Sequence, residues 1–189
     1  MLIFSGCTRL FGWDIHAPGI LSNGFLQTIP QAEQRIALYL PESTFSYESK
    51  DKGSRFSDPQ TYHVGESFAP MVLEAFQSSF NEFIYMETIP RKDILERYDI
   101  PYLVVLQIKG FDNTKDLRGQ KLTVLTDVIV LDQDFNKLGR FESKGVSDAK
   151  KVFAKKGGPE VNLNAAIEKS IEGIILTLQD SFGSGRWSA

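Results

Sequence analysis

The side chains best suited to acid–base chemistry lie far apart along the sequence. The two histidines, His16 and His63, are separated by 47 positions and stand in loop-like surroundings. A histidine works as a general base only when a nucleophile and an orienting group lie within hydrogen-bond reach. Neither histidine has such a neighbour nearby in the sequence. We therefore expect no catalytic histidine, and two distant histidines also predict no histidine-based metal site.

Two close pairs of aspartates are the other candidates for chemistry: Asp112 with Asp116, and Asp132 with Asp134. The second pair opens like a calcium loop, but Lys137 stands where that loop needs glycine. We expect both pairs in solvated turns. The common zinc, phosphate-loop, dinucleotide and nucleophile-elbow motifs are absent. The sequence predicts no enzyme and no cofactor; the alternative is an enzyme whose carboxylates converge from distant loops.

The single cysteine, Cys7, ends the stretch Phe4-Ser5-Gly6-Cys7, which is preceded by apolar residues. Such a stretch is typical of a bacterial lipobox, where small residues admit a signal peptidase and the thiol receives a diacylglycerol. Only six residues precede Cys7, whereas a signal peptide needs a charged start and about 7–15 apolar residues. The lipobox interpretation therefore requires a longer precursor, with residues 1–7 as its remnant. The alternative is an ordinary, partly buried thiol.

Residues 8–34 have scattered glycine, proline and asparagine among isolated apolar residues, without a steady period. This composition predicts an irregular tether or linker between Cys7 and the first packed element. Its aromatic residues are too many for a free linker, so part of the segment should pack on the domain or on a partner. Because aromatic residues dominate interface energetics, we predict partner contacts at Phe11, Trp13 and Phe25.

The net charge of −3 conceals a basic segment. Residues 137–156 carry seven basic and two acidic side chains, a local charge of +5. A cluster of this kind can attract anionic lipid or glycan, whereas the plainer interpretation is a solvated strand edge and loop. If the cluster binds an anionic ligand, the residues involved are Lys150, Lys151, Lys155 and Lys156.

Periodicity predicts the elements of one domain over residues 35–182. Strands are expected at 35–40, 45–49, 83–87, 102–108, 121–131 and 138–143, and helices at 65–80, 91–98 and 164–182. The last helix has the clearest apolar stripe, with Asn164 as its N-cap. Strand 102–108 is apolar on both faces and should be central. Residues 183–189 are expected to form a loose tail.

This order of elements predicts an α+β fold: an antiparallel or mixed sheet of about five to six strands with two amphipathic helices packed on one face. The chain of 189 residues is 42% hydrophobic, and at this length about two thirds of the unfolded surface becomes buried. No apolar run reaches the roughly 18 residues that a membrane-spanning helix needs. The acidic balance gives no sign of nucleic-acid binding.

The chain resembles small bacterial envelope lipoproteins in three stretches: FSGC at 4–7, RIALYLP at 35–41 and ERYDIPYLVVLQIKGF at 96–111. Similar proteins are the YajG-like lipoproteins, the PelC and CsgG-type domains, the LpoB activator of penicillin-binding proteins and the amino-terminal domain of TolB. The likeness lies mainly in the order of elements over about 35–182. That family has no shared catalytic residues to carry over.

The resemblance implies a lipid-anchored protein on the periplasmic face of the bacterial outer membrane. We expect a non-enzymatic subunit or regulator of a cell-envelope complex, anchored at Cys7, that contacts other envelope proteins or copies of itself. The alternative is a transport or assembly factor for lipopolysaccharide or another glycolipid, which would bind anionic head groups through the lysine cluster named above.

Overall fold

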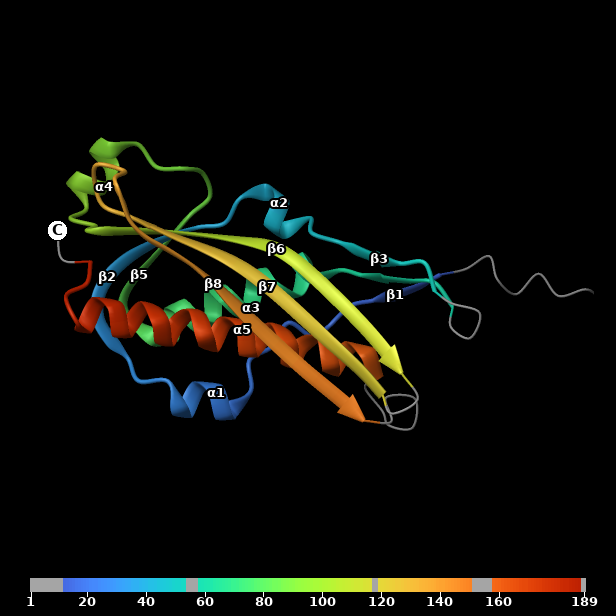
Figure 1. Cartoon of the computed structure of the whole chain (residues 1–189). Coiled ribbons are helices and arrows are strands. Elements are labelled where there is room, and N and C mark those ends of the chain that lie inside the picture. The colour runs from blue at the N-terminus through green and yellow to red at the C-terminus, as the bar shows by residue number, and fades with distance from the viewer. Residues whose placement is uncertain (1–11, 54–57, 117–118, 151–157, 188–189) are drawn as a thin grey trace, which may run out of the picture.

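Two sheets and the helices around them form the architecture of the computed structural model, which describes residues 12–53, 58–116, 119–150 and 158–187 (Figure 1). The larger sheet has five strands in the order β5 (Phe80–Met86), β2 (Ala32–Tyr39), β6 (Tyr102–Asp116), β7 (Gly119–Leu131) and β8 (Lys137–Lys150). The smaller sheet has the order β1 (Trp13–Ile15), β4 (Gln60–Tyr62) and β3 (Ser49–Asp51).

The five-stranded sheet is mixed, as the order of elements predicts. Strand β2 pairs in parallel with both β5 and β6, whereas β6, β7 and β8 form an antiparallel meander. Parallel neighbours require crossover connections, and here helices lie on those connections. Strand β6 is the third of the five strands and is buried on both faces, which confirms the prediction of a central strand at 102–108.

Helices α3 (Val64–Ser79) and α5 (Gly158–Gly183) form the main core with one face of the large sheet. Each helix buries a stripe of apolar side chains that recur at the helical period, and this period is visible in the sequence. These stripes include Phe68, Met71, Val72 and Phe76 in α3 and Ile167, Ile171, Ile174 and Leu178 in α5. The predicted α+β fold with two helices on one face is therefore confirmed.

A short helix, α4 (Lys92–Arg97), covers one end of the opposite sheet face. Its Leu95 forms a second, smaller core with Ala37 of β2 and Leu103 of β6. This second core explains why β2 and β6 are apolar on both faces near α4. Over the rest of that face, polar side chains of β6, β7 and β8 reach the surface.

The contact between α5 and β8 depends on small residues. A Cβ atom added at Gly145 of β8 would lie 1.9 Å from the backbone oxygen of Ala166 in α5. The Ser143 hydroxyl donates a 2.7 Å hydrogen bond to the Ser170 carbonyl. Lys169 of α5 donates to the Val146 carbonyl of β8 at 2.9 Å. The helix therefore lies against the strand backbone itself, which the lack of a side chain at Gly145 permits.

A bulge in β6 turns the second half of that strand toward the small sheet. The pairing with β7 shifts between Ile108 and Gly110. Such a bulge changes which alternate side chains face inward. Before it, Leu106 and Ile108 face the core, whereas after it Phe111 packs on the core and Asn113 reaches β3 and β4.

A polar network joins the small sheet to β6 and β7. The buried hydroxyl of Tyr62 accepts hydrogen bonds from Asn113 at 3.1 Å and from Gln120 at 2.7 Å, and burial raises its pKa to about 12. Asp51 accepts from Lys115 at 2.9 Å and from Asn113 at 3.0 Å. Burial alone would raise the Asp51 pKa, but the bonds from Lys115, the Gly53 amide and Asn113 outweigh it, so the pKa lies below its usual value.

The part of the expected tether that the structure describes is folded. Residues 12–34 contain β1, the short helix α1 (Asn23–Thr28) and the start of β2. Ile15, Leu21 and Phe25 are buried in the main core. The expectation that part of this segment packs on the domain is confirmed, whereas an irregular linker is not found at these residues, because several of their isolated apolar side chains enter the core.

The long helix begins earlier than its expected cap. Helix α5 starts at Gly158, so Asn164 lies inside the helix and does not cap it. Its side chain instead accepts a hydrogen bond from the Gly19 amide at 3.0 Å and donates to the Ile20 carbonyl at 2.8 Å. One turn later, Glu168 accepts from the amide of Ser22 at 2.7 Å. These bonds hold the N-terminal segment along α5.

Two further expectations differ from the structure. The strand expected at 45–49 does not form: Phe45 ends the short helix α2 (Glu42–Phe45), residues 46–48 lie in a turn and loop, and β3 begins at Ser49. The expected loose tail is packed as far as Trp187, whose side chain is 6% exposed and stacks with Phe141. Gly139 makes room for this indole, since a Cβ atom there would lie 2.6 Å from the indole nitrogen.

Replacing Gly145 by alanine should destabilise the fold. The added methyl group must displace the α5 backbone, and overpacking of this kind costs about 1–3 kcal/mol. Urea unfolding followed by circular dichroism would measure the loss. Gly183→Ala is the matched control, because a Cβ atom there meets nothing within 4 Å. Equal stability of the two variants would contradict the close contact between α5 and β8.

Replacing Asp51 by asparagine should lower stability near neutral pH by about 1–2 kcal/mol, since charge-assisted hydrogen bonds are lost. Because the folded-state pKa of Asp51 is lowered, its contribution is present above the unfolded pKa and disappears as the pH falls through the folded pKa. The variant should therefore lose less stability than the parent when acidified below about pH 4. Asp112→Asn, at an exposed position on β6, is the control and should lose less stability near neutral pH than Asp51→Asn does.

Candidate partner-binding surface

The sequence-predicted site residues fall in different surroundings. Cys7 and Phe11 lie outside the described residues. Trp13, the first residue of β1, is 62% exposed. Phe25 is 5% exposed and belongs to the main core. Trp13 therefore remains a candidate partner contact. The side chain of Phe25 already has its contacts within the domain and is not available to a partner.

Trp13 stands on the outer strand of the small sheet, which projects from one end of the large sheet (Figure 1). Its backbone is fixed because the Trp13 amide donates to the Pro59 carbonyl at 2.9 Å and the residue pairs with Gln60. The indole thus combines a rigid backbone with an exposed ring. Rigid exposed aromatic side chains are the residues that most often anchor protein interfaces.

The four lysines of the predicted anion-binding cluster have no described side chains. Lys151, Lys155 and Lys156 lie outside the described residues, and so does the side chain of Lys150. The preceding part of β8 is described and is not uniformly basic: Arg140 and Lys144 alternate with Glu142.

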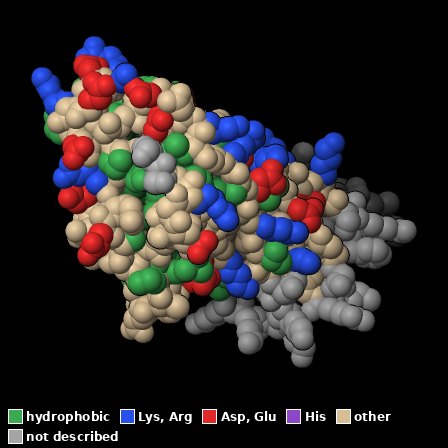
Figure 2. Space-filling model, turned by 60° about the vertical axis from the view of Figure 1, so that its left-hand side comes forward, with side chains coloured by type: hydrophobic (Ala, Val, Ile, Leu, Met, Phe, Trp, Pro, Cys, Tyr) green, Lys and Arg blue, Asp and Glu red, His purple; other side chains and the backbone are tan. Residues whose placement is uncertain are grey.

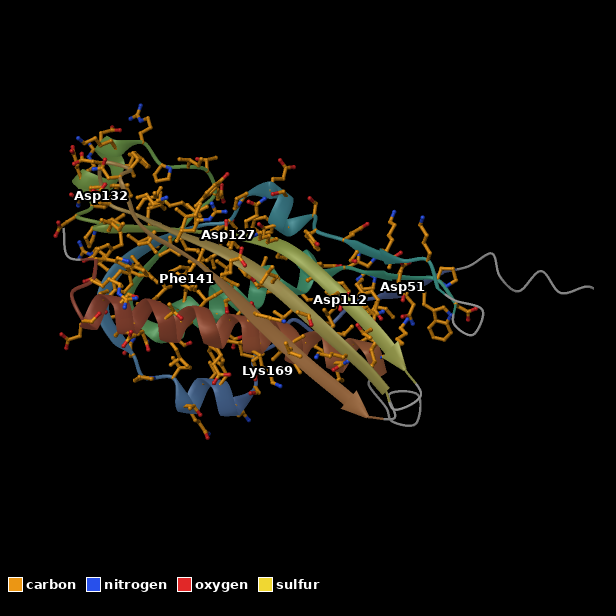
Figure 3. The ribbon with its side chains drawn as sticks, viewed as in Figure 1. Asp51, Asp112, Asp127, Asp132, Phe141 and Lys169 are labelled. Carbon is orange, nitrogen blue, oxygen red and sulfur yellow. The ribbon has the colours of Figure 1, made fainter. Side chains whose placement is uncertain are left out.

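The sheet face opposite α5 carries charged side chains in pairs. Arg140 of β8 donates two hydrogen bonds to Asp127 of β7, at 2.9 and 2.8 Å. Lys109 of β6 forms an ion pair with Glu142 of β8. Figure 3 shows Asp112 and Asp127 on this sheet, and Figure 2 shows side chains of both signs mixed over the visible surface. Because Arg140 and Lys109 on this face are paired with carboxylates, the face is not the uniformly basic surface that binding of a polyanion would favour.

A groove of about 300 Å³ lies on the same sheet, next to the β6 bulge. It is lined by Gly110, Phe111, Asp112, Thr123, Leu125 and Lys144. Its volume is at the low end for small-molecule sites, which span about 300–1,000 Å³. The groove has one Asp and one Lys, and its lining residues include no histidine or cysteine that could act as a nucleophile or a base.

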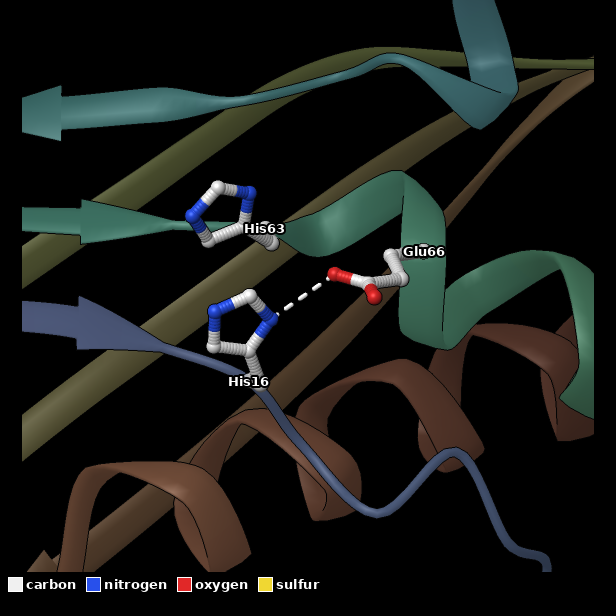
Figure 4. A group of neighbouring side chains, drawn as sticks. All are labelled: His16, His63 and Glu66. Carbon is white, nitrogen blue, oxygen red and sulfur yellow. Dashed lines mark hydrogen bonds and ion pairs between the residues drawn. The ribbon is translucent and has the colours of Figure 1, made fainter.

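The two histidines meet in the structure, contrary to the expectation from their separation in the sequence. The rings of His16 and His63 are stacked, with centroids 4.2 Å apart and planes 7° from parallel (Figure 4). The cause is the parallel pairing of β1 with β4, which places Ile15 opposite Tyr62. His16 and His63 are the next residues of the two strands, and the His63 amide donates to the Ile15 carbonyl at 3.1 Å.

Three carboxylates surround the stacked rings. Glu66, in the first turn of α3, has an oxygen 2.8 Å from Nδ1 of His16. His63 has a Glu48 oxygen 3.0 Å from Nδ1 and an Asp14 oxygen 3.4 Å from Nε2. Both histidines therefore have carboxylate neighbours in the structure, although no orienting group was expected near either of them.

Only part of this cluster has a signal in the sequence. Glu66 follows His63 by three positions, a spacing that brings side chains together on a helix. The pairing of β1 with β4 joins segments of three residues each, and such short strands show no period of their own. The contact between His16 and His63 therefore depends on tertiary structure alone.

No protein-family profile matches the chain, and no curated protein matches it by sequence. Among solved structures, the chain is similar to protein XCC0632 from Xanthomonas campestris, which its structure assigns to the DUF330 family. The identity is 8% and the TM-score 0.57, covering 91% of this chain and 94% of that one. At this identity the likeness establishes a shared fold: the chain is an α+β domain of the kind found in XCC0632.

Two other solved structures are more distant. The PelC dodecamer from Paraburkholderia phytofirmans matches with 12% identity and a TM-score of 0.38, over 77% of this chain and 92% of that one. The lipoprotein GNA1162 from Neisseria meningitidis matches with 7% identity and a TM-score of 0.35, over 80% and 99%. Within the described residues, no helix has the length and apolarity required to span a bilayer.

Proposed function

We propose that this protein is a non-enzymatic lipoprotein of the bacterial outer membrane, a structural or assembly subunit of a cell-envelope complex. Acylated Cys7 holds the domain at the periplasmic face, and the domain contacts other envelope proteins or copies of itself. The observation that carries the proposal is the exposed Trp13 on an outer strand, six positions after the candidate lipidation site.

The short separation between Cys7 and β1 limits where the domain can lie. Six residues span at most about 20 Å even when fully extended. A lipid on Cys7 would therefore keep the small sheet next to the membrane surface. Helix α4 lies at the other end of the large sheet and would face away from the anchor (Figure 1), and Ile89 lies three positions before this helix in the sequence.

The described surface supports binding rather than catalysis. The open sheet face carries paired charges, and its groove holds one Asp and one Lys. Trp13, in contrast, presents an indole that is 62% exposed on a fixed backbone. An aromatic side chain of this kind contributes most when a partner removes it from water.

The anchor is tested by intact mass spectrometry of the mature protein. The native gene with its full upstream region is expressed in a bacterial host, and the product is extracted from membranes. We expect a chain that begins at Cys7 and carries added acyl mass, with neither feature in Cys7→Ser. An unmodified N-terminus on a protein found outside the membrane fraction would refute the lipoprotein proposal.

The contact surface is tested with a photo-crosslinking amino acid placed at Trp13. Ile89 is the matched control because it is 63% exposed, almost the same as Trp13, at the other end of the domain. We expect crosslinks from position 13 to an envelope protein or to a second copy of the chain, and none from position 89. Crosslinks to lipid alone, or equal products from both positions, would contradict a partner contact at Trp13.

A further inference from the structure

We infer that His16, His63 and Glu66 form a binding site for a divalent transition-metal ion of the Zn²⁺ type. Each residue offers one ligand atom, and these atoms all lie within 4.8 Å of one another. A zinc ion about 2.0–2.2 Å from each ligand atom separates those atoms by about 3–3.5 Å. The distance of 2.8 Å between His16 and Glu66 is already near that range.

The backbone around the site is held in place from several sides. The His63 amide donates to the Ile15 carbonyl at 3.1 Å, which ties the two histidine-bearing segments together. The Ser67 hydroxyl donates to the Ala17 carbonyl at 3.1 Å, which ties the residue after His16 to α3. Gly65 fits against the backbone of α2, since a Cβ atom there would lie 2.1 Å from the Thr44 carbonyl oxygen. The three ligands therefore project from a fixed framework.

The local charge favours a cation. Asp14, Glu48 and Glu66 surround the two imidazoles. Within the described ranges, the ion pairs of these three carboxylates are made with the two histidines, and no lysine or arginine takes part. A divalent ion would balance the carboxylates, whose mutual repulsion is otherwise relieved only by solvent and the imidazoles.

The donor set selects the class of ion. Imidazole nitrogens with a carboxylate oxygen suit zinc, copper and nickel, whereas calcium and magnesium prefer oxygen ligands alone. A carboxylate oxygen lies beside each ring nitrogen of His63, Glu48 at 3.0 Å from Nδ1 and Asp14 at 3.4 Å from Nε2, so the nitrogen that does not bind the ion can donate a hydrogen bond to one of them. Carboxylates commonly orient metal-binding histidines in this way.

Binding requires one small rearrangement. The nitrogen lone pairs of an imidazole lie in the plane of its ring, so those of two stacked rings lie in parallel planes. One of the two histidine rings must therefore turn before a nitrogen of each can point at a single ion. His16 can turn, because its side chain is 52% exposed, whereas that of His63 is 21% exposed and lies between Glu48 and Asp14. The bound ion would then join β1 to the start of α3 and fix the segment that follows Cys7.

The test is a titration of the full chain with Zn²⁺ by isothermal calorimetry, carried out on the parent and on Cys7→Ser. We expect one equivalent to bind in both, accompanied by a rise in Tm. His16→Ala, His63→Ala and Glu66→Gln should each weaken binding about tenfold or more. Glu74→Gln, on the exposed side of the same helix, is the matched control and should bind as the parent does.

A second measurement separates metal binding from folding. The chain has two histidines in total, so labelled imidazoles give two sets of resonances, and both should shift on zinc binding. Glu66→Gln preserves side-chain shape at an exposed position, and its circular dichroism should equal that of the parent. The inference would be overturned by the lack of saturable binding, by binding that disappears in Cys7→Ser, or by unchanged affinity in the histidine variants.

Discussion

The close contact of α5 with β8 holds most of the other elements in position. Because Gly145 has no side chain, the helix backbone can lie against the strand, and Ser143 and Ser170 add hydrogen bonds across the contact. The same helix then carries bonds to three distant parts of the chain: Asn164 to the N-terminal segment, Asn162 to β7 and Gln179 to the end of α3. If α5 moved outward by the radius of a methyl group, these bonds would lengthen together. The close packing of α5 on one face of β7 and β8 therefore holds these long strands in place, although their other face carries polar side chains.

The N-terminal segment is part of the domain over the residues that the structure describes. Ile15, Leu21 and Phe25 complete the core, and the hydrogen bonds of Asn164 and Glu168 hold the chain between them. Only a short stretch of sequence therefore separates Cys7 from the folded domain. A lipid at Cys7 would thus set the height of the domain above the membrane and also its orientation. His16 of the histidine cluster directly follows β1, the first described strand after Cys7.

Long periodic elements could be predicted from the sequence, whereas contacts between short segments could not. The apolar stripes of α3 and α5 and the continuous apolar run at the start of β6 identify the helices, the central strand and the fold class. The three-residue strands of the small sheet are too short to show a period, and the bulge at Ile108 hides the continuation of β6. The burial of Trp187 could not be predicted from the sequence, because the indole occupies space that is open only because Gly139 has no side chain. The histidine cluster was missed for a related reason, since His16 follows β1 and is brought to His63 and Glu66 only by the pairing of two three-residue strands.

The parallel pairing of β1 with β4 has a consequence for the order in which the chain folds. Three residues of β1 pair with three that follow 47 positions later. Closing a loop of that length for so few hydrogen bonds is unfavourable until other contacts have formed. The helices and the meander of β6, β7 and β8 are more local, so they can assemble first and present β4 as a template. Strand β1 is then among the last elements of the domain to pair, although it precedes the other described strands in the sequence.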